Sequence, residues 1–177
     1  MTYLFLPLFG QFVSRSEFRG ACRPPRVPTG WETSERSASL TAQLGIWSKK
    51  DGTGKVTDSN GGYAIAGASR NPMTPDAAWI SLERLNTVPP EKRAQFLPVC
   101  PDFVIELRLR CDNLKPLQEK MEEWVKLGVK LGWLIDPTNR IVYIYRRGKA
   151  VERLDNPAEV KGDRILPNLT LDLTSIW

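Results

Sequence analysis

Glu106 occupies a position where a carboxylate needs a compensating partner. It lies in the run at residues 101–107 (PDFVIEL), which is apolar apart from its acids and is typical of a central strand covered on both faces. An ionised carboxylate in such a strand is costly unless a cation or several hydrogen-bond donors compensate it. Two partners are available: Arg108, which the two-residue period of a strand places on the same face, and a divalent metal ion shared with a second carboxylate. Both interpretations remain open at this point.

Asp76 is the candidate second carboxylate, and Lys120 is a candidate cation. Asp76 follows a proline at the start of a short apolar run, and Glu106 comes 30 residues later. A Pro-Asp pair commonly begins a strand or turn, and Asp102 is a second instance, so Asp76 taken alone fits a turn residue better than a ligand. Lys120 taken alone fits a solvated lysine among acidic neighbours on a helix.

The composition narrows the chemistry that these residues could support. The chain of 177 residues has no histidine, which excludes Ser-His-Asp and Cys-His catalysis and every zinc site that needs imidazole. Its three cysteines, Cys22, Cys100 and Cys111, show no CxxC spacing, which argues against a disulfide framework and favours a reducing cytoplasm. A net charge of +5 permits an anionic partner such as nucleic acid.

From residue 29 onward the apolar pattern predicts one α/β domain. Leu40, Leu44 and Trp47 recur at helical spacing after the candidate N-caps Thr33 and Ser34. A second helix is expected from 113 to 128, with a brief helix at 89–96. A hairpin is expected around the Asn-Gly-Gly sequence at 60–62. Strands are expected at 55–59, 63–67, 76–80, 101–107, 132–136, 141–145, 151–154 and 169–173.

The strand–helix–strand unit over residues 101–136 positions the candidate residues. A helix of this length between two buried strands predicts a parallel strand pair. Residues 1–28 differ from the rest, because RGACRPPRVP at 19–28 has no period, and we expect an irregular arm there. The apolar run at residues 2–13 is too short to cross a bilayer and no basic residue precedes it, so we expect no membrane anchor and no export signal.

An Asp at the start of one strand, a Glu in the next strand and a Lys on the following helix occur in this order in the chain. This order resembles that of the PD-(D/E)xK nuclease superfamily. The stretch PDFVIELRLRCDNLKPLQEKMEEWVKLGVKLGWLIDPTNRIVYIYR, with TPDAAWISLERL before it and ILPNLTLDLTSIW after it, is similar to the Uma-type family of "putative restriction endonucleases" known from cyanobacteria. The resemblance covers residues 29–177, whereas residues 1–28 do not resemble the helix and strand pair with which relatives open. It implies an α/β (α+β) fold with a restriction-endonuclease-like mixed β-sheet flanked by helices.

The resemblance also implies roles for the candidate residues. Asp76, Glu106 and the main-chain carbonyl of Leu107 would hold Mg²⁺ or Mn²⁺, and Lys120 would orient the attacking water or the phosphate. The superfamily name places a lysine two residues after the glutamate, where this chain has Arg108. Because arginine stays protonated, Arg108 can bind phosphate or form an ion pair but cannot be a general base.

The resemblance implies a Mg²⁺-dependent endodeoxyribonuclease that hydrolyses DNA phosphodiester bonds, without an organic cofactor or membrane partner. The alternative is a catalytically impaired nuclease-fold protein that binds DNA or a protein partner, with Arg146, Arg147 and Lys149 as candidate contacts. In a third interpretation Glu106 only pairs with Arg108. By analogy a homodimer is also expected, with the residue 141–145 strand or Trp177 as candidate contacts.

Overall fold

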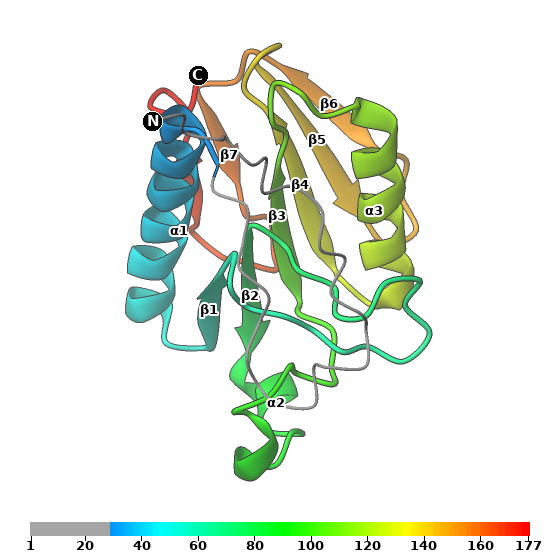
Figure 1. Ribbon diagram of the computed structural model, residues 1–177. Helices are drawn as coiled ribbons and strands as arrows, with labels where there is room; N and C mark the ends of the chain where they lie inside the picture. Colours follow the sequence, from blue (N-terminus) through cyan, green and yellow to red (C-terminus); the bar gives the residue numbers. More distant parts are fainter. Residues whose placement is uncertain (1–28) are drawn as a thin grey trace, which may run out of the picture.

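A mixed six-stranded sheet forms the centre of the molecule (Figure 1). The computed structural model describes residues 29–177, and the predicted arm over residues 1–28 lies outside them. The main sheet contains, in spatial order, β1 (Gly54–Asp58), β2 (Ala77–Ser81), β3 (Phe103–Leu107), β4 (Leu131–Asp136), β5 (Ile141–Arg146) and β6 (Glu152–Asp155). The other elements are α1 (Trp31–Asp51), α2 (Leu82–Leu85), the 3₁₀ helix η2 (Pro90–Lys92), α3 (Leu114–Leu127) and a separate pair of strands, β7 (Glu159–Lys161) and β8 (Thr170–Asp172).

The strand–helix–strand unit has the predicted arrangement. β3 and β4 are parallel neighbours with α3 between them in the chain, and Leu107 is paired with Ile135 in the register. The four other strand pairs of the main sheet are antiparallel. Because β2 runs against β3, the start of β2 lies beside the end of β3. The end of β3 is therefore where Asp76 and Glu106 can meet.

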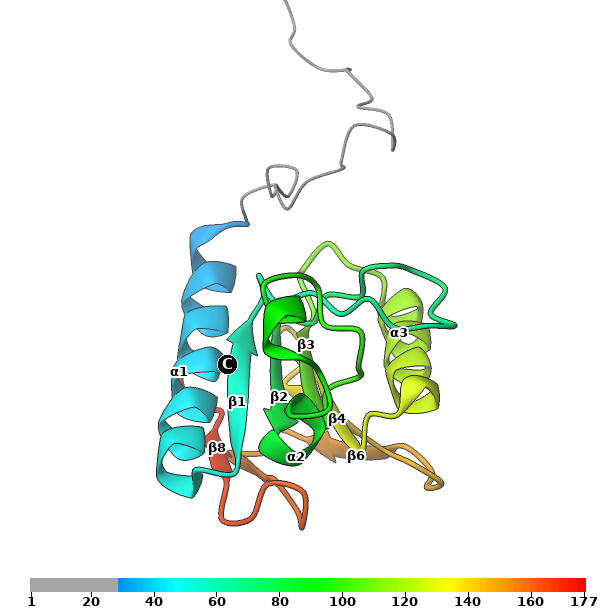
Figure 2. The same cartoon turned by 90° about the horizontal axis from the view of Figure 1, so that it is seen from below.

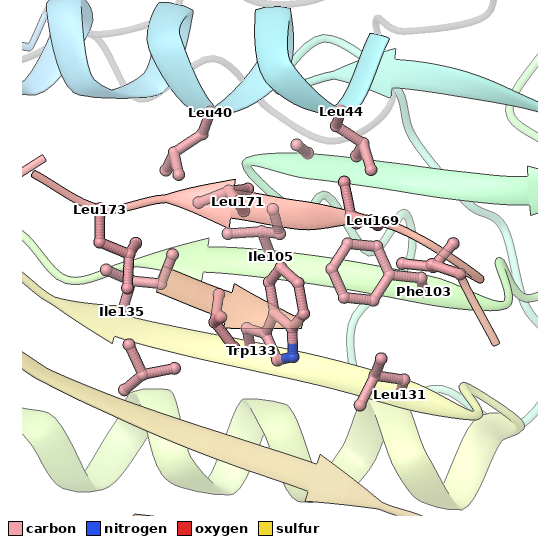
Figure 3. Packing of buried hydrophobic residues seen from close by; sticks show 14 of the residues in the cluster. Leu40, Leu44, Phe103, Ile105, Leu131, Trp133, Ile135, Leu169, Leu171 and Leu173 are labelled. Carbon is pink, nitrogen blue, oxygen red and sulfur yellow. The ribbon is translucent and has the colours of Figure 1, made fainter. Parts of the chain in front are cut away.

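The two long helices cover opposite faces of the sheet (Figures 1 and 2). Leu40 and Leu44 of α1 are buried with alternate strand residues such as Ile105 and Trp133, and with residues around β7 and β8 (Figure 3). Met121 and Trp124 of α3 pack on the other face. Burying each such leucine contributes about 1.5–3 kcal/mol relative to exposure. Apolar residues on both sides of β3 and β4 explain why their sequences read as continuous apolar runs.

Both long helices end at a glycine, as the sequence predicts. Gly52 and Gly128 have positive φ angles of 75° and 119°, and the N–H of each donates to a carbonyl of the preceding turn. The start of α1 differs from the prediction, because the N-cap is Gly30 and helical conformation already includes Thr33 and Ser34. These two hydroxyl side chains therefore lie on the first turn of the helix.

One predicted strand is absent. Residues 63–67 form no strand; Tyr63 is buried and makes isolated bridges with Met73 and Leu97. The turn after β1 therefore does not close a hairpin, and β1 pairs with β2 instead. The strand predicted at residues 169–173 is present as β8, and it pairs with β7 in the separate two-stranded sheet. Within residues 29–177, no helix has the length and apolar character needed to span a membrane.

The two segments named as dimer contacts are used within the chain. β5 lies between β4 and β6, so its main-chain groups pair inside the sheet. The indole N–H of Trp177 donates to the carbonyl of Pro157 at 2.9 Å, and its ring packs against the core on the α1 face.

Candidate active site

The antiparallel pairing of β2 and β3 places Asp76 beside Glu106. The N–H of Asp76 donates to the carbonyl of Ile105 at 3.0 Å, which continues the β2–β3 ladder by one residue. The N–H of Leu107 then donates to the Asp76 carboxylate, with Oδ2 at 2.7 Å. The Asp76 side chain is thus fixed against the main chain of the residue that follows Glu106.

Helix α3 supplies the donors that hold the Glu106 side chain. Lys120 Nζ lies 2.7 Å from Oε1 and 2.8 Å from Oε2 of Glu106, and Trp124 Nε1 donates to Oε1 at 2.9 Å. Lys120 and Trp124 are four residues apart and therefore share one face of α3. Lys120 also donates to the main-chain carbonyl of Thr74 at 2.9 Å. The lysine is thereby positioned between the segment before β2 and the end of β3.

Burial is the largest influence on the pKa of Glu106, which is only 3% exposed. Burial raises the pKa of Glu106 to about 7, the ammonium of Lys120 opposes this change, and the negative charge of Asp76 adds to it. The influence of Asp76 means that the two carboxylates lie close enough to repel one another. A divalent cation between them would relieve both the repulsion and the cost of burying the charge.

The raised pKa predicts how metal-free stability depends on pH. The pKa of Glu106 is about 7 in the folded protein, against an ordinary glutamate value of 4.5, so the folded state binds this proton more tightly than the unfolded state does. The stabilisation that the folded state gains from this proton is fully present below pH 4.5 and is lost as pH rises through 7. Relative to Glu106→Gln, wild-type protein in EDTA should lose on the order of 3 kcal/mol of unfolding free energy between pH 4.5 and 8. Urea denaturation measures this, and parallel pH profiles for the two proteins would contradict it.

The two carboxylates line a pocket of about 800 Å³ whose other lining residues come from α1, the end of β1 and α3. One wall carries hydroxyl groups of α1, from Thr33, Ser34, Ser37 and Thr41. The charged lining consists of four acids and one base: Asp58, Asp76, Glu106, Asp112 and Lys120. The charged side chains therefore give the pocket a net negative charge. The residues of α1 that line it add neutral hydrogen-bonding groups.

The donor set fits a hard divalent cation. Asp76 and Glu106 offer carboxylate oxygens, and Leu107, the predicted source of a main-chain ligand, lines the same pocket. Within residues 29–177 no group of three or more acidic or cysteine side chains could hold a metal ion. Two carboxylates suit Mg²⁺, which prefers oxygen and keeps several waters, better than a metal that requires a full protein cage.

Arg108 does not pair with Glu106, and that prediction is wrong. Its Nη1 lies 2.5 Å from Oδ2 of buried Asp136, and its Nε and Nη2 donate to the carbonyl of Asp112. The N–H of Arg108 donates to the carbonyl of Ile135 at 2.8 Å, so its main chain stays beside the end of β4. Its guanidinium therefore reaches the end of the neighbouring strand, and Lys120 is the cation beside Glu106.

The second Pro-Asp pair has a structural role. Asp102 is fully buried near the start of β3, at the other end of the strand from Glu106. It accepts a hydrogen bond from the N–H of Ser81 and forms ion pairs with Arg84 at 3.2 Å and Lys130 at 2.9 Å. Burial alone would raise the pKa of Asp102, but these partners lower it below its ordinary value. Asp102 is thus a compensated buried charge away from the pocket.

Sequence reasoning missed three contributors to the site: the indole of Trp124, the carbonyl of Thr74 and the hydroxyl groups of α1. The four-residue spacing of Lys120 and Trp124 would have indicated Trp124 once Lys120 was a candidate. No local pattern indicated the other two, because they depend on the placement of distant segments.

A family model described as "Uma2: Putative restriction endonuclease" matches residues 24–174. The chain belongs to the Uma2 family. The resemblance inferred from the sequence is therefore confirmed. No curated protein matches the chain.

Solved structures show the fold of this Uma2 protein. A crystal structure described as a putative nuclease belonging to DUF820 from Anabaena variabilis has a TM-score of 0.70 and 19% sequence identity, and the match covers 85% of this chain and 82% of the other. At that identity the likeness concerns the fold alone, and it confirms the nuclease-like mixed sheet with flanking helices. A DrdV–DNA complex has 17% identity over 71% of this chain and 69% of the other, but its TM-score of 0.41 is too low to bear on the Uma2 protein.

Proposed function

We propose that this Uma2 protein is a Mg²⁺-dependent endodeoxyribonuclease that hydrolyses DNA phosphodiester bonds. The observation that carries the proposal is the convergence of Asp76, Glu106 and Lys120 in one pocket, at the adjoining ends of β2 and β3. Membership of a family described as restriction endonucleases supports DNA as the substrate. The chain has no histidine, so hydrolysis cannot depend on an imidazole base, and carboxylates and a lysine are gathered in this pocket instead.

Each residue has a role that follows from its contacts. Asp76, Glu106 and the Leu107 carbonyl would hold the ion, which when bound supplies charge neutralisation at the phosphate and a lowered pKa of water. Lys120 Nζ lies within 2.9 Å of both carboxylate oxygens of Glu106 and of the Thr74 carbonyl. From this position its ammonium would orient a phosphate oxygen or the attacking water. Trp124 keeps the Glu106 carboxylate in place.

The direct test is cleavage of supercoiled plasmid DNA by the full chain. With Mg²⁺ or Mn²⁺ the protein should convert supercoiled DNA to nicked and linear forms, and EDTA should prevent this. No conversion with either ion, under conditions where the protein is folded by circular dichroism, would overturn the proposal.

Replacing Lys120 by alanine should slow cleavage about a hundredfold, because the donor that orients the water or phosphate is lost. Single-turnover cleavage rates would measure the effect, and circular dichroism would establish that the variant is folded. Lys126→Ala is the matched control, since Lys126 is an exposed lysine near the other end of α3. Equal rates for Lys120→Ala and Lys126→Ala would remove Lys120 from the mechanism.

A second candidate function is DNA or protein binding without cleavage. A hollow of about 870 Å³ is lined by five basic residues and two acids: Lys130, Arg146, Arg147, Lys149, Arg164, Glu152 and Asp163. Of the three contacts predicted from the sequence, Arg146 is paired with Glu152 at 2.6 Å and Asp163 at 2.5 Å, which leaves Arg147 and Lys149. Salt-sensitive DNA affinity without cleavage would favour this alternative.

A further inference from the structure

A smaller hollow adjoins the candidate catalytic pocket and carries the opposite charge. Its volume is about 250 Å³, and it shares Thr33 of α1 and Leu107 of β3 with the larger pocket. Its charged lining consists of three bases and one acid: Arg36, Arg108, Arg110 and Glu32. A cationic hollow therefore begins at the residue that follows Glu106.

This juxtaposition addresses a difficulty for a polyanionic substrate. The catalytic pocket carries four acids and one lysine, so it repels a phosphodiester until a cation is bound. Nucleic-acid strands carry one phosphate per nucleotide, and proteins position such strands through arginine and lysine contacts to the phosphates on either side of the reacting one. The adjoining hollow has the charge and the location that a neighbouring phosphate requires.

The three arginines differ in how far they are committed to the fold. Arg108 is fixed by Asp136 and Asp112, and three of its five N–H donors are used in these contacts. Arg36 makes a long contact of 3.5 Å with Glu32, one turn earlier on α1. Arg110 is exposed, and within residues 29–177 it has no ion pair or side-chain hydrogen bond. Arg110 and Arg36 are thus the cations best able to bind a ligand.

We infer that Arg110 and Arg36, beside the anchored Arg108, form a subsite for the DNA phosphate next to the scissile one. Arginine suits this role because its planar guanidinium binds phosphate oxygens in pairs and is always charged. The inference rests on the proposed nuclease function, since it names the part of the same substrate that the hollow holds. It assigns to α1 a charged contact in addition to its hydroxyl wall.

The test measures DNA binding separately from cleavage. Fluorescence anisotropy with a labelled 20-base-pair duplex in EDTA gives the affinity of the full chain at several salt concentrations. Removing both side chains in Arg36→Ala/Arg110→Ala should weaken binding and reduce the slope of log affinity against log salt by about 1 per arginine. Arg153→Ala is the matched control, because it removes an exposed arginine from β6 whose ion-pair partner within residues 29–177 is Asp155. Its slope should equal that of the wild type.

The outcomes separate the subsite from the nuclease proposal. An unchanged slope in the double variant, or no measurable DNA affinity in the wild type, overturns the subsite. A reduced slope in a protein that never cuts plasmid DNA retains the subsite and rejects the nuclease. If the wild type cuts plasmid DNA and the double variant has an unchanged slope, the nuclease proposal is retained and the subsite is rejected. Thermal unfolding of the double variant within a few degrees of the wild type establishes that the fold is retained.

Discussion

Replacing Glu106 by glutamine should lower the rate of Mg²⁺-dependent DNA cleavage by at least about a thousandfold. The substitution keeps the size of the side chain but removes the negative charge that would hold the metal ion. Electrostatic groups aimed at a reacting centre in a buried site are worth about a hundredfold to a thousandfold each, and here the ion itself is also lost. Asp76→Asn should have an effect of the same order, because the two carboxylates act as one unit.

The comparison requires a glutamate that plays no part in the site. Glu122 is exposed on α3, two residues after Lys120, so Glu122→Gln makes the same chemical change on the same helix. Single-turnover cleavage should be near wild-type in Glu122→Gln and almost absent in Glu106→Gln. Substantial cleavage by a folded Glu106→Gln protein would show that the chemistry does not depend on this carboxylate.

Mg²⁺ should raise the melting temperature of the wild-type protein by about 5–10 °C when its concentration is a hundredfold above the dissociation constant. Ligand binding at that excess stabilises the folded state by about 2.7 kcal/mol, and a chain of this size gains about 2–4 °C per kcal/mol. The physical source is relief of the repulsion between Asp76 and buried Glu106. Because protons compete for Glu106, whose pKa is about 7, the gain should be larger at pH 8 than at pH 6.

Variants at two acids of the same pocket make this experiment specific. Asp76→Asn should abolish the rise in melting temperature. Asp58→Asn should retain it, because Asp58 lines the pocket but is engaged by the main chain and side chain of Asn60. Differential scanning fluorimetry with and without Mg²⁺ measures both. Equal shifts in the two variants would point to ions bound across the acidic pocket rather than at the Asp76–Glu106 pair.

The sequence predicted the parts of the site that depend on order along the chain. The apolar run containing Glu106 identified a central strand, and the following helical pattern identified α3 and the parallel pair β3–β4. Asp76 alone was indistinguishable from a turn residue, and so was Asp102. Only the pairing of β2 with β3 separates them, because it brings Asp76 to the pocket and leaves Asp102 with Arg84.

The failures share a physical cause, which is competition from partners distant in the sequence. The strand period predicted Arg108 beside Glu106, but buried Asp136 at the end of β4 offers it a closer partner. A strong turn signal after β1 predicted a hairpin, but Tyr63 is instead buried and packs edge-on against Trp124, with ring centroids 6.0 Å apart. Local sequence propensity determines which helices and strands form. Burial against residues distant in the sequence then determines which elements and side chains become neighbours.

The position of α1, which forms one wall of the pocket, depends on the last part of the chain. Gln43 exchanges hydrogen bonds with the main chain of Asp172, and the indole N–H of Trp47 donates to the carbonyl of Pro167, across separations of 129 and 120 residues. During synthesis, α1 therefore leaves the ribosome long before the segment that secures it. A nascent chain that lacks residues 167–172 also lacks these contacts to α1, so we expect the pocket to reach its final form only after that segment has been synthesised.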